Sequence, residues 1–248
     1  MCELFGLSAS HPIAARETPL GEFGLRGGQA ADNPDGWGIA WREAEDFQIA
    51  KEPLPACQSE QFARLRDTLS SNLIVAHVRK AKFPPVNTLN NTHPFLQDCC
   101  GRRWVFAHNG LVPEIVGMEQ ANRERICRPE GETDSEFAFC HLLSHVSRHF
   151  HDADWLAALG RVSELIALRG QFNFLMSDGE SLIAYGHDRL HYLETAGGSR
   201  DAALVSTEPL SMHGAWTPFV PGELRIYRAG ARVGRILTRP PETGTSAP

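Results

Sequence analysis

Two consecutive helical patterns separate a mainly strand-like first half of this chain from a strand-like end. They cover residues 133–150 and 155–168, and a shorter helical pattern covers residues 60–69. Apolar residues recur every three or four positions in a surface helix and alternate in a strand, so each such segment can bury one face. No internal repeat and no linker is visible. This order of elements predicts a single domain of the α+β class, in which helices and sheets pack in layers.

Individual elements follow from apolar periodicity and from turn residues. Thr133 and Glu136 form a capping-box pattern at the start of a helix. A long loop is expected over residues 80–98. Residues 239–248 are rich in Pro, Thr and Gly, which predicts a flexible tail after a domain that spans residues 1–238. Strands are expected at residues 3–7, 37–41, 73–78, 104–107, 172–176, 181–186, 190–193, 203–206 and 223–227, with turns at Asn33–Gly36, Asp178-Gly179 and Gly197-Gly198.

Composition and charge narrow the class of partner. Of the 248 residues, 42% are hydrophobic, and the formal net charge is -6 at pH 7. A negative chain without a Lys/Arg-rich run argues against nucleic-acid binding and favours a small-molecule partner. No apolar run is long enough to span a membrane, and no basic segment followed by an apolar one marks a signal peptide. We therefore expect no membrane association and a cytoplasmic location.

Cysteine and histidine spacing gives no metal-binding pattern. The six cysteines form no C-x-x-C pair, and in a reducing compartment free thiols are the default over disulfides. His141, His145 and His149 have helical spacing, but His141 and His145 fall opposite the apolar face of their helix, so we expect them in solvent. No carboxylate or cysteine accompanies them in a metal-binding pattern. The glycines of residues 24–28 lack the spacing of a phosphate loop, so neither a metal nor a cofactor is expected.

Cys2 directly follows the initiator methionine. Removal of Met1 would leave Cys2 with a free α-amino group. The thiolate is the reactive form of cysteine, and an amine with a pKa of ~8 can take the proton of a thiol whose pKa is ~8.5. Nucleophile and base would then belong to one residue, as in enzymes that use an N-terminal threonine. The alternatives are that Cys2 packs as a small apolar residue at the start of a strand or carries a lipid.

Four further residues could complete such a site. Arg79 at a strand end could bind both oxygens of a carboxylate, and Asp134 at a helix start could bind an ammonium group. Together they would hold the two charged ends of an α-amino acid. The side-chain amide of Asn109 and the backbone N–H of Gly110 could form an oxyanion hole. The alternatives are an exposed arginine, a carboxylate near the positive end of a helix dipole, and an ordinary Asn-Gly turn.

These residues lie in segments that resemble the class II glutamine amidotransferases, which belong to the N-terminal nucleophile hydrolases. The similarity spans nearly the whole chain and is greatest to the stand-alone YafJ-like branch, which includes enzymes that cut γ-glutamyl bonds. The matching segments are Met1 to Gly6, Asp35 to Gly38, His77 to Arg79, Asn91 to Phe95, Ala107 to Gly110, Gly131 to Glu136, Val205 to Leu210 and Pro221 to Glu223.

The resemblance implies a four-layer αββα sandwich, with two antiparallel sheets stacked between helices. It also implies that the mature enzyme begins at its cysteine and that a pocket binds the α-carboxylate and α-amino groups of glutamine. No cofactor is implied. The residues placed at the site are Cys2, Asn109 and Gly110 as catalytic groups and Arg79, Asp134, His93 and His108 as substrate-binding groups, with His93 shaping the pocket.

Two departures from the family pattern widen the choice of activity. Arg79 is followed by Lys80-Ala81-Lys82, whereas in the synthase members a tryptophan follows, then a threonine and a histidine that help to hold the substrate carboxylate. A second domain that could receive ammonia is also not expected. The first hypothesis is an amidohydrolase that cleaves glutamine or a γ-glutamyl compound through a thioester on Cys2. The alternatives are a subunit that donates ammonia to a separate acceptor protein and a catalytically inactive γ-glutamyl-binding module.

Overall fold

A computed structural model describes residues 1–82, 84–152, 154–195, 201–211 and 214–239. Within these residues, the strands form a seven-stranded sheet in the order β11-β9-β10-β1-β4-β2-β3 and a six-stranded sheet in the order β13-β12-β8-β7-β6-β5. The first sheet contains β1 (Glu3–Ala14), β2 (Trp37–Glu43), β3 (Asp46–Glu52), β4 (Ser70–Val78), β9 (His191–Thr195), β10 (Ala202–Ser206) and β11 (Thr217–Pro218). The second contains β5 (Phe95–Cys99), β6 (Arg102–Leu111), β7 (Gln171–Ser177), β8 (Ser181–Gly186), β12 (Glu223–Arg228) and β13 (Ala231–Leu237).

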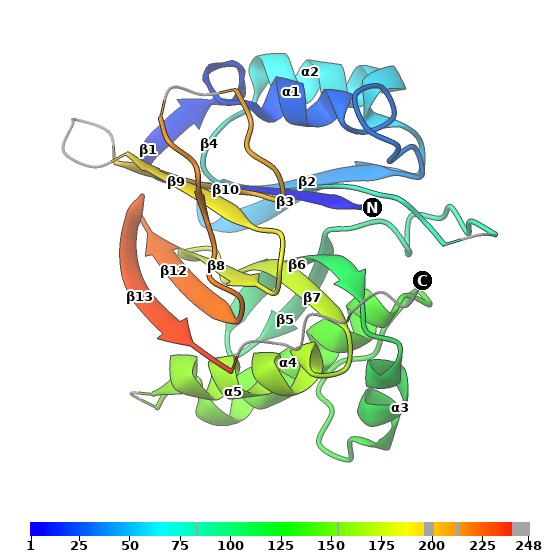
Figure 1. The fold of residues 1–248 in the computed structure, drawn as a ribbon, viewed down its shortest axis with the longest axis vertical. Helices are drawn as coiled ribbons and strands as arrows, with labels where there is room; N and C mark the ends of the chain where they lie inside the picture. The colour runs from blue at the N-terminus through cyan, green and yellow to red at the C-terminus, as the bar shows by residue number, and fades with distance from the viewer. Residues whose placement is uncertain (83, 153, 196–200, 212–213, 240–248) are drawn as a thin grey trace.

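Helices cover the outer face of each sheet. The two sheets lie face to face in the middle of the molecule, with α1 and α2 over the first sheet and α4 and α5 over the second, while α3 lies beside α4 (Figure 1). The α-helices are α1 (Leu20–Leu25), α2 (Glu60–Thr68), α3 (Glu114–Ala121), α4 (Asp134–His149) and α5 (Trp155–Ala167), with 3-10 turns at Ala15–Glu17 and Ala56–Gln58.

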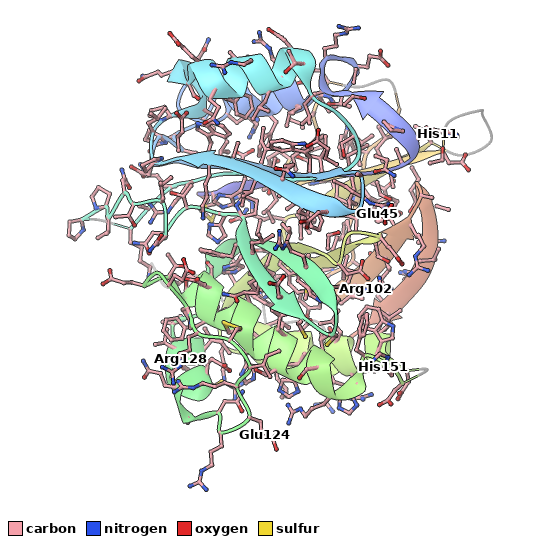
Figure 2. The ribbon with its side chains drawn as sticks, turned by 180° about the vertical axis from the view of Figure 1, so that it is seen from behind. His11, Glu45, Arg102, Glu124, Arg128 and His151 are labelled. Atoms are coloured by element: carbon pink, nitrogen blue, oxygen red, sulfur yellow. A yellow bond between two sulfur atoms is a disulfide. The ribbon has the colours of Figure 1, made fainter. Side chains whose placement is uncertain are left out.

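Successive side chains along each strand point to opposite faces of its sheet. They fill the space between the two sheets and the space between each sheet and its helices. In β1, Leu4 packs between the sheets, whereas Phe5 packs with the residues under α1 and α2. In β6, Val105 packs between the sheets, whereas Phe106 stacks on Phe139 of α4 with ring centroids 5.0 Å apart. Side chains occupy the space between the layers throughout (Figure 2). The α+β class and the four-layer αββα sandwich are confirmed, with every strand pairing antiparallel among the described residues.

The length of β6 decides between a strand and a turn at Asn109-Gly110. It continues to Leu111, so His108, Asn109 and Gly110 lie within a strand that pairs with β7. The interpretation of Asn109-Gly110 as a turn is therefore wrong. Pairing with a neighbouring strand outweighs the local turn preference of the dipeptide, as tertiary context commonly does in sheets.

The sequence patterns did not predict α3 or the strands β3, β5, β11 and β13. β3 and β13 are edge strands, which bury less surface and carry charged residues that break the apolar alternation. The apolar residues of α3 are spread around the helix rather than along one stripe. β5 begins at Phe95, so the loop expected over residues 80–98 is shorter. The expected turn at Gly197-Gly198 and residues 240–248 lie outside the described residues.

Two expectations about α4 and its neighbours are wrong. His141 is 8% exposed rather than solvated, because α3 covers it and Glu119 Oε2 lies 2.8 Å from its Nδ1. Cys127 and Cys140 form a disulfide rather than free thiols, because the segment before α4 folds back onto that helix with the two Cα atoms 5.6 Å apart. None of the helices in the described ranges combines the length and apolar character needed to cross a membrane.

Candidate active site

Cys2 lies where the start of β1 meets the end of β4. Glu3 pairs with Val78 across the two strands, which brings Cys2 next to the residues that follow β4. Its Sγ accepts a hydrogen bond from Lys80 N at 3.2 Å, and as a thiol it can donate to Lys80 O at 3.3 Å. On the other face of β1, the Glu3 carboxylate is ion-paired with Arg26. The start of β1 is therefore held from both faces.

A cavity of about 370 Å³ opens beside Cys2. It lies between the segment after β4, the end of β6 and the start of α4. Every site residue expected from the sequence lines this cavity except Asn109. The lining residues from that set are Cys2, Arg79, His93, His108, Gly110 and Asp134.

The thiol of Cys2 is held in its protonated form. Burial raises its pKa, and this outweighs the opposing effects of the hydrogen bond from Lys80, the positive N-terminus and the Arg79 guanidinium. A thiol of raised pKa is a poor nucleophile at neutral pH unless a base removes its proton. An α-amino group on Cys2 itself would stand within reach of Sγ.

Arg79 and Asp134 are charged groups at two walls of the cavity. Arg79 is 7% exposed, and its Nη1 donates to Asp35 O at 3.3 Å and to Asn87 Oδ1 at 2.9 Å. Both partners are uncharged acceptors, so the positive charge is available to an anionic ligand. Asp134 is the first residue of α4, and its Oδ2 accepts a hydrogen bond from Val112 N at 2.7 Å.

His108 is a neutral, doubly hydrogen-bonded imidazole. Its Nε2 lies 3.2 Å from Gln171 O, and its Nδ1 lies 2.8 Å from Ser135 Oγ. A carbonyl oxygen can only accept, so Nε2 carries the proton and Nδ1 accepts from the serine. Burial lowers the pKa of His108, which keeps the ring uncharged at neutral pH.

His77 and His93 form a second pair of neutral rings, of which His93 lines the cavity. Their centroids lie 4.1 Å apart, and the four ring nitrogens are buried without hydrogen-bond partners among the described residues. Burial, reinforced by the charge of Arg79, lowers the pKa of His77 to about 3. Burial also holds the pKa of His93 well below its ordinary value. Sequence reasoning gave no role to His77.

Acid should destabilise the fold through His77. The pKa of His77 is about 3 in the folded chain, against 6.5 for an unperturbed histidine. As pH falls from 6.5 towards 3, His77 therefore becomes protonated in the unfolded chain but stays neutral in the folded chain. Such an uptake lowers the free energy of unfolding by ~1.4 kcal/mol per pH unit. Denaturant titrations between pH 7 and 5 should show a free energy of unfolding that falls with pH, and His93 and His108, whose pKa values burial also lowers, contribute in the same direction. The share of His77 approaches ~1.4 kcal/mol per pH unit below its unfolded pKa. His77→Leu should reduce the slope by about that amount, whereas His11→Gln, at an exposed position, should leave it unchanged. Equal slopes in the wild-type protein and both variants would contradict the low pKa of His77.

Asn109 faces the layer between the two sheets. It is 1% exposed, and its Nδ2 donates to Thr207 Oγ1 at 3.3 Å. The same hydroxyl accepts from Leu4 N at 2.9 Å, so Thr207 connects the end of β6 to the start of β1. An amide nitrogen carries two protons, and Thr207 accepts only one of them. Sequence reasoning missed Thr207, although it lies in one of the segments that resemble the family.

Gly110 has a backbone conformation that requires glycine. Its φ is +152°, and a Cβ at this position would lie 1.9 Å from Gln171 O. Both the dihedral angle and the close approach exclude any larger side chain. The backbone of Gly110 is thereby exposed to the cavity next to Cys2 and His108.

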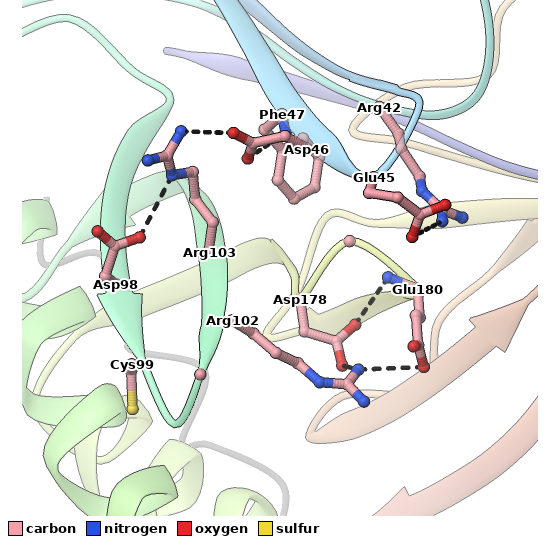
Figure 3. A pocket seen from close by; sticks show the side chains of 12 residues that line it. Arg42, Glu45, Asp46, Phe47, Asp98, Cys99, Arg102, Arg103, Asp178 and Glu180 are labelled. Carbon is pink, nitrogen blue, oxygen red and sulfur yellow. Dashed lines mark hydrogen bonds and ion pairs between the residues drawn. The ribbon is translucent and has the colours of Figure 1, made fainter.

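A larger cavity, of about 470 Å³, lies at the opposite ends of β2, β6 and β7 (Figure 3). Its arginines are paired with carboxylates. Arg102 Nη1 lies 2.6 Å from Asp178 Oδ2, and Arg103 Nη1 lies 2.8 Å from Asp46 Oδ2. These charges neutralise one another, so we assign the chemistry to the smaller cavity at Cys2.

Comparison with known proteins identifies the family of this chain. Residues 1–197 match the family model of the class II glutamine amidotransferases. The putative glutamine amidotransferase YafJ of Escherichia coli is 32% identical over 94% of this chain and 100% of its own length. The crystal structure of a predicted glutamine amidotransferase from Pseudomonas aeruginosa superimposes with a TM-score of 0.67 at 28% identity, covering 94% of this chain and 100% of that one.

A relative with a named substrate is more distant. The gamma-glutamyl-hercynylcysteine sulfoxide hydrolase of Mycobacterium tuberculosis is 27% identical over 74% of this chain and 71% of its own length. The family model covers well over half of the residues, and YafJ is matched from end to end. This chain therefore belongs to the class II glutamine amidotransferases.

Proposed function

We propose that this protein is an amidohydrolase that cleaves the γ-carboxamide of glutamine or of a γ-glutamyl compound through a thioester on Cys2. One observation carries the proposal: the Cys2 thiol, the Gly110 backbone and the charged groups of Arg79 and Asp134 line one cavity. A purely binding protein needs neither a thiol nor an oxyanion hole, which counts against the inactive module.

The reaction begins once Met1 has been removed. The α-amino group of Cys2 takes the thiol proton, and Sγ attacks the γ-carbonyl carbon. The negative charge that develops on the carbonyl oxygen is stabilised by the Nδ2 of Asn109 and the N–H of Gly110. Collapse of the tetrahedral intermediate breaks the C–N bond, and the protonated α-amino group donates its proton to the leaving amine.

Hydrolysis of the thioester uses the same groups again. The α-amino group, now neutral, takes a proton from water, and the hydroxide equivalent attacks the acyl carbon. The C–S bond breaks, glutamate leaves, and Cys2 recovers its proton. A thiol that is protonated at rest needs a base at every turnover, and the α-amino group of Cys2 would be that base.

Recognition would rest on the two ends of the glutamyl group. The Arg79 guanidinium would bind the α-carboxylate and the Asp134 carboxylate the α-amino group. Val86, Leu111 and Val116 also line the cavity, whose volume of about 370 Å³ would accept a leaving group larger than ammonia. The Mycobacterium relative is named as a hydrolase of a γ-glutamyl compound, which supports the same reaction class here.

Blocking either end of the glutamyl group should nearly abolish turnover. A charged group left unpaired in a closed pocket costs ~1–3 kcal/mol or more, which corresponds to a loss of ~5- to ~150-fold or more. The measurement is kcat/KM for glutamine, a larger γ-glutamyl amide and N-acetylglutamine, read as glutamate or N-acetylglutamate release. Asp134→Asn should raise KM, whereas Glu60→Gln, at an exposed carboxylate that begins α2 and lies outside this cavity, should not.

The outcome separates the candidate functions. Efficient cleavage of N-acetylglutamine would remove Asp134 from its proposed role. Strict restriction to free glutamine would favour the ammonia-donating subunit over the hydrolase, and no cleavage of any of the three substrates would favour the binding module.

A further inference from the structure

Asn173 lies on β7 directly opposite Asn109 on β6. It is 1% exposed, and its side chain faces the layer between the two sheets, as that of Asn109 does. β6 and β7 are neighbouring strands of the second sheet, with β5 beyond β6 at its edge (Figure 1). The Nδ2 of Asn173 donates to Asn109 O at 3.2 Å.

The hydrogen bond from Asn173 is made to the peptide group between Asn109 and Gly110, whose N–H would form part of the oxyanion hole. Asn109 O and Gly110 N belong to the same peptide unit. In a trans peptide the C=O and the N–H point in opposite directions. The carbonyl points towards β7 and Asn173, so the N–H of Gly110 points away from β7.

The side away from β7 is the side that a ligand can reach. β5 pairs with β6 only as far as Phe106, and within the described residues no strand continues that edge past Phe106. The cavity beside Cys2 opens there, and Gly110 forms part of its wall. A hydrogen bond to the carbonyl also polarises the peptide and strengthens its N–H as a donor.

The amide of Asn173 is itself fixed in orientation. Its Oδ1 accepts hydrogen bonds from three consecutive backbone N–H groups, those of His187 at 2.8 Å, Asp188 at 3.1 Å and Arg189 at 3.3 Å. The second proton of its Nδ2 is donated to Asp188 Oδ1 at 2.8 Å. With every donor and acceptor engaged, the side chain presents one defined N–H to Asn109 O.

We propose that Asn173 is a positioning residue for the reaction, which orients and polarises the Asn109–Gly110 peptide so that the Gly110 N–H stabilises the oxyanion. This inference rests on the proposed function of the Cys2 site. Asn173 would act through this peptide and would not touch the substrate.

The test is an exchanged pair, Asn173→Asp combined with Asp188→Asn. The aspartate at position 173 keeps the oxygen that accepts the three backbone N–H groups but cannot donate to Asn109 O. The asparagine at position 188 preserves the net charge and can donate to its new partner. Asp188→Asn alone is the matched control, since residue 188 is exposed and keeps an oxygen that can accept from Asn173. Asn173→Ala is a second variant without any side-chain donor.

The assays use γ-glutamyl-p-nitroanilide and glutamine. Sites are counted by exhaustive labelling with an electrophilic glutamine analogue, so that kcat is given per competent site even if part of a variant misfolds. The exchanged pair and Asn173→Ala should lose kcat by ~10-fold or more, less than the ~10²–10³-fold expected for loss of a direct donor. Their KM should stay within about twofold of the control.

Three results would overturn the inference. If wild-type protein and Asn109→Ala behave as an oxyanion-hole enzyme but both Asn173 variants retain kcat per site, Asn173 is structural only and the proposed function stands. If KM rises while kcat per site is kept, Asn173 acts on ground-state binding. If wild-type protein cleaves neither substrate and Cys2 is not labelled, the proposed function fails and the inference fails with it.

Discussion

Cys2→Ala should abolish hydrolysis of every γ-glutamyl substrate, with a loss of kcat of ~10⁴-fold or more. Removal of a covalent nucleophile eliminates the acyl-enzyme route altogether, and losses of this size or larger are typical of such substitutions. Cys2 is half-buried and its thiol contacts the Lys80 backbone, so alanine leaves a small space and the fold should persist. Glutamate release and a thermal unfolding curve measured on the same preparation would separate chemistry from stability.

Cys57→Ala is the control for this substitution. Cys57 is also a half-buried free thiol, but it does not line the cavity at Cys2. Its replacement should leave kcat within about twofold of wild type. Turnover retained in Cys2→Ala, or lost in Cys57→Ala without unfolding, would contradict the assignment of the nucleophile.

Asn109→Ala should lower kcat by ~10²–10³-fold with little change in KM. An oxyanion donor acts on charge that develops only in the transition state, so its removal affects turnover far more than substrate binding. The Thr207 hydroxyl would lose a neighbour but would still accept from Leu4 N. Steady-state kinetics with the substrate that wild-type protein cleaves best would measure the effect.

Asn90→Ala provides the matched comparison because Asn90 is exposed. It should leave both kinetic constants unchanged. If Asn109→Ala raised KM and left kcat intact, Asn109 would be a ground-state contact rather than part of an oxyanion hole.

The sequence predicted the elements that have strong periodic signals. α4 has its apolar face buried as expected, and Thr133 Oγ1 accepts from Glu136 N at its start. The second half of the capping box differs, because the Glu136 carboxylate accepts from Glu130 N and Gly131 N. Edge strands such as β3 and β13 were missed because a half-exposed strand tolerates charges that hide its pattern.

Part of the candidate site could be predicted because some residue types can be recognised by their chemistry. Cys2, Arg79 and Asp134 have residue types whose chemistry is recognisable at the ends of elements. Thr207 and Asn173 are common residues whose relation to Asn109 appears only in three dimensions, at sequence separations of 98 and 64. The burial of His141 likewise depends on α3, an element without a clear periodic signal.

The proposed nucleophile is the thiol of Cys2 as the N-terminal residue of the mature chain. Reaction of active enzyme with an electrophilic diazoketone analogue of glutamine, followed by intact-mass and peptide analysis, tests it directly. The predicted result is a chain that lacks Met1 and carries one adduct, on Cys2. Active enzyme that retains Met1, or an adduct on another cysteine with Cys2 unmodified, would rule out Cys2 as an N-terminal nucleophile.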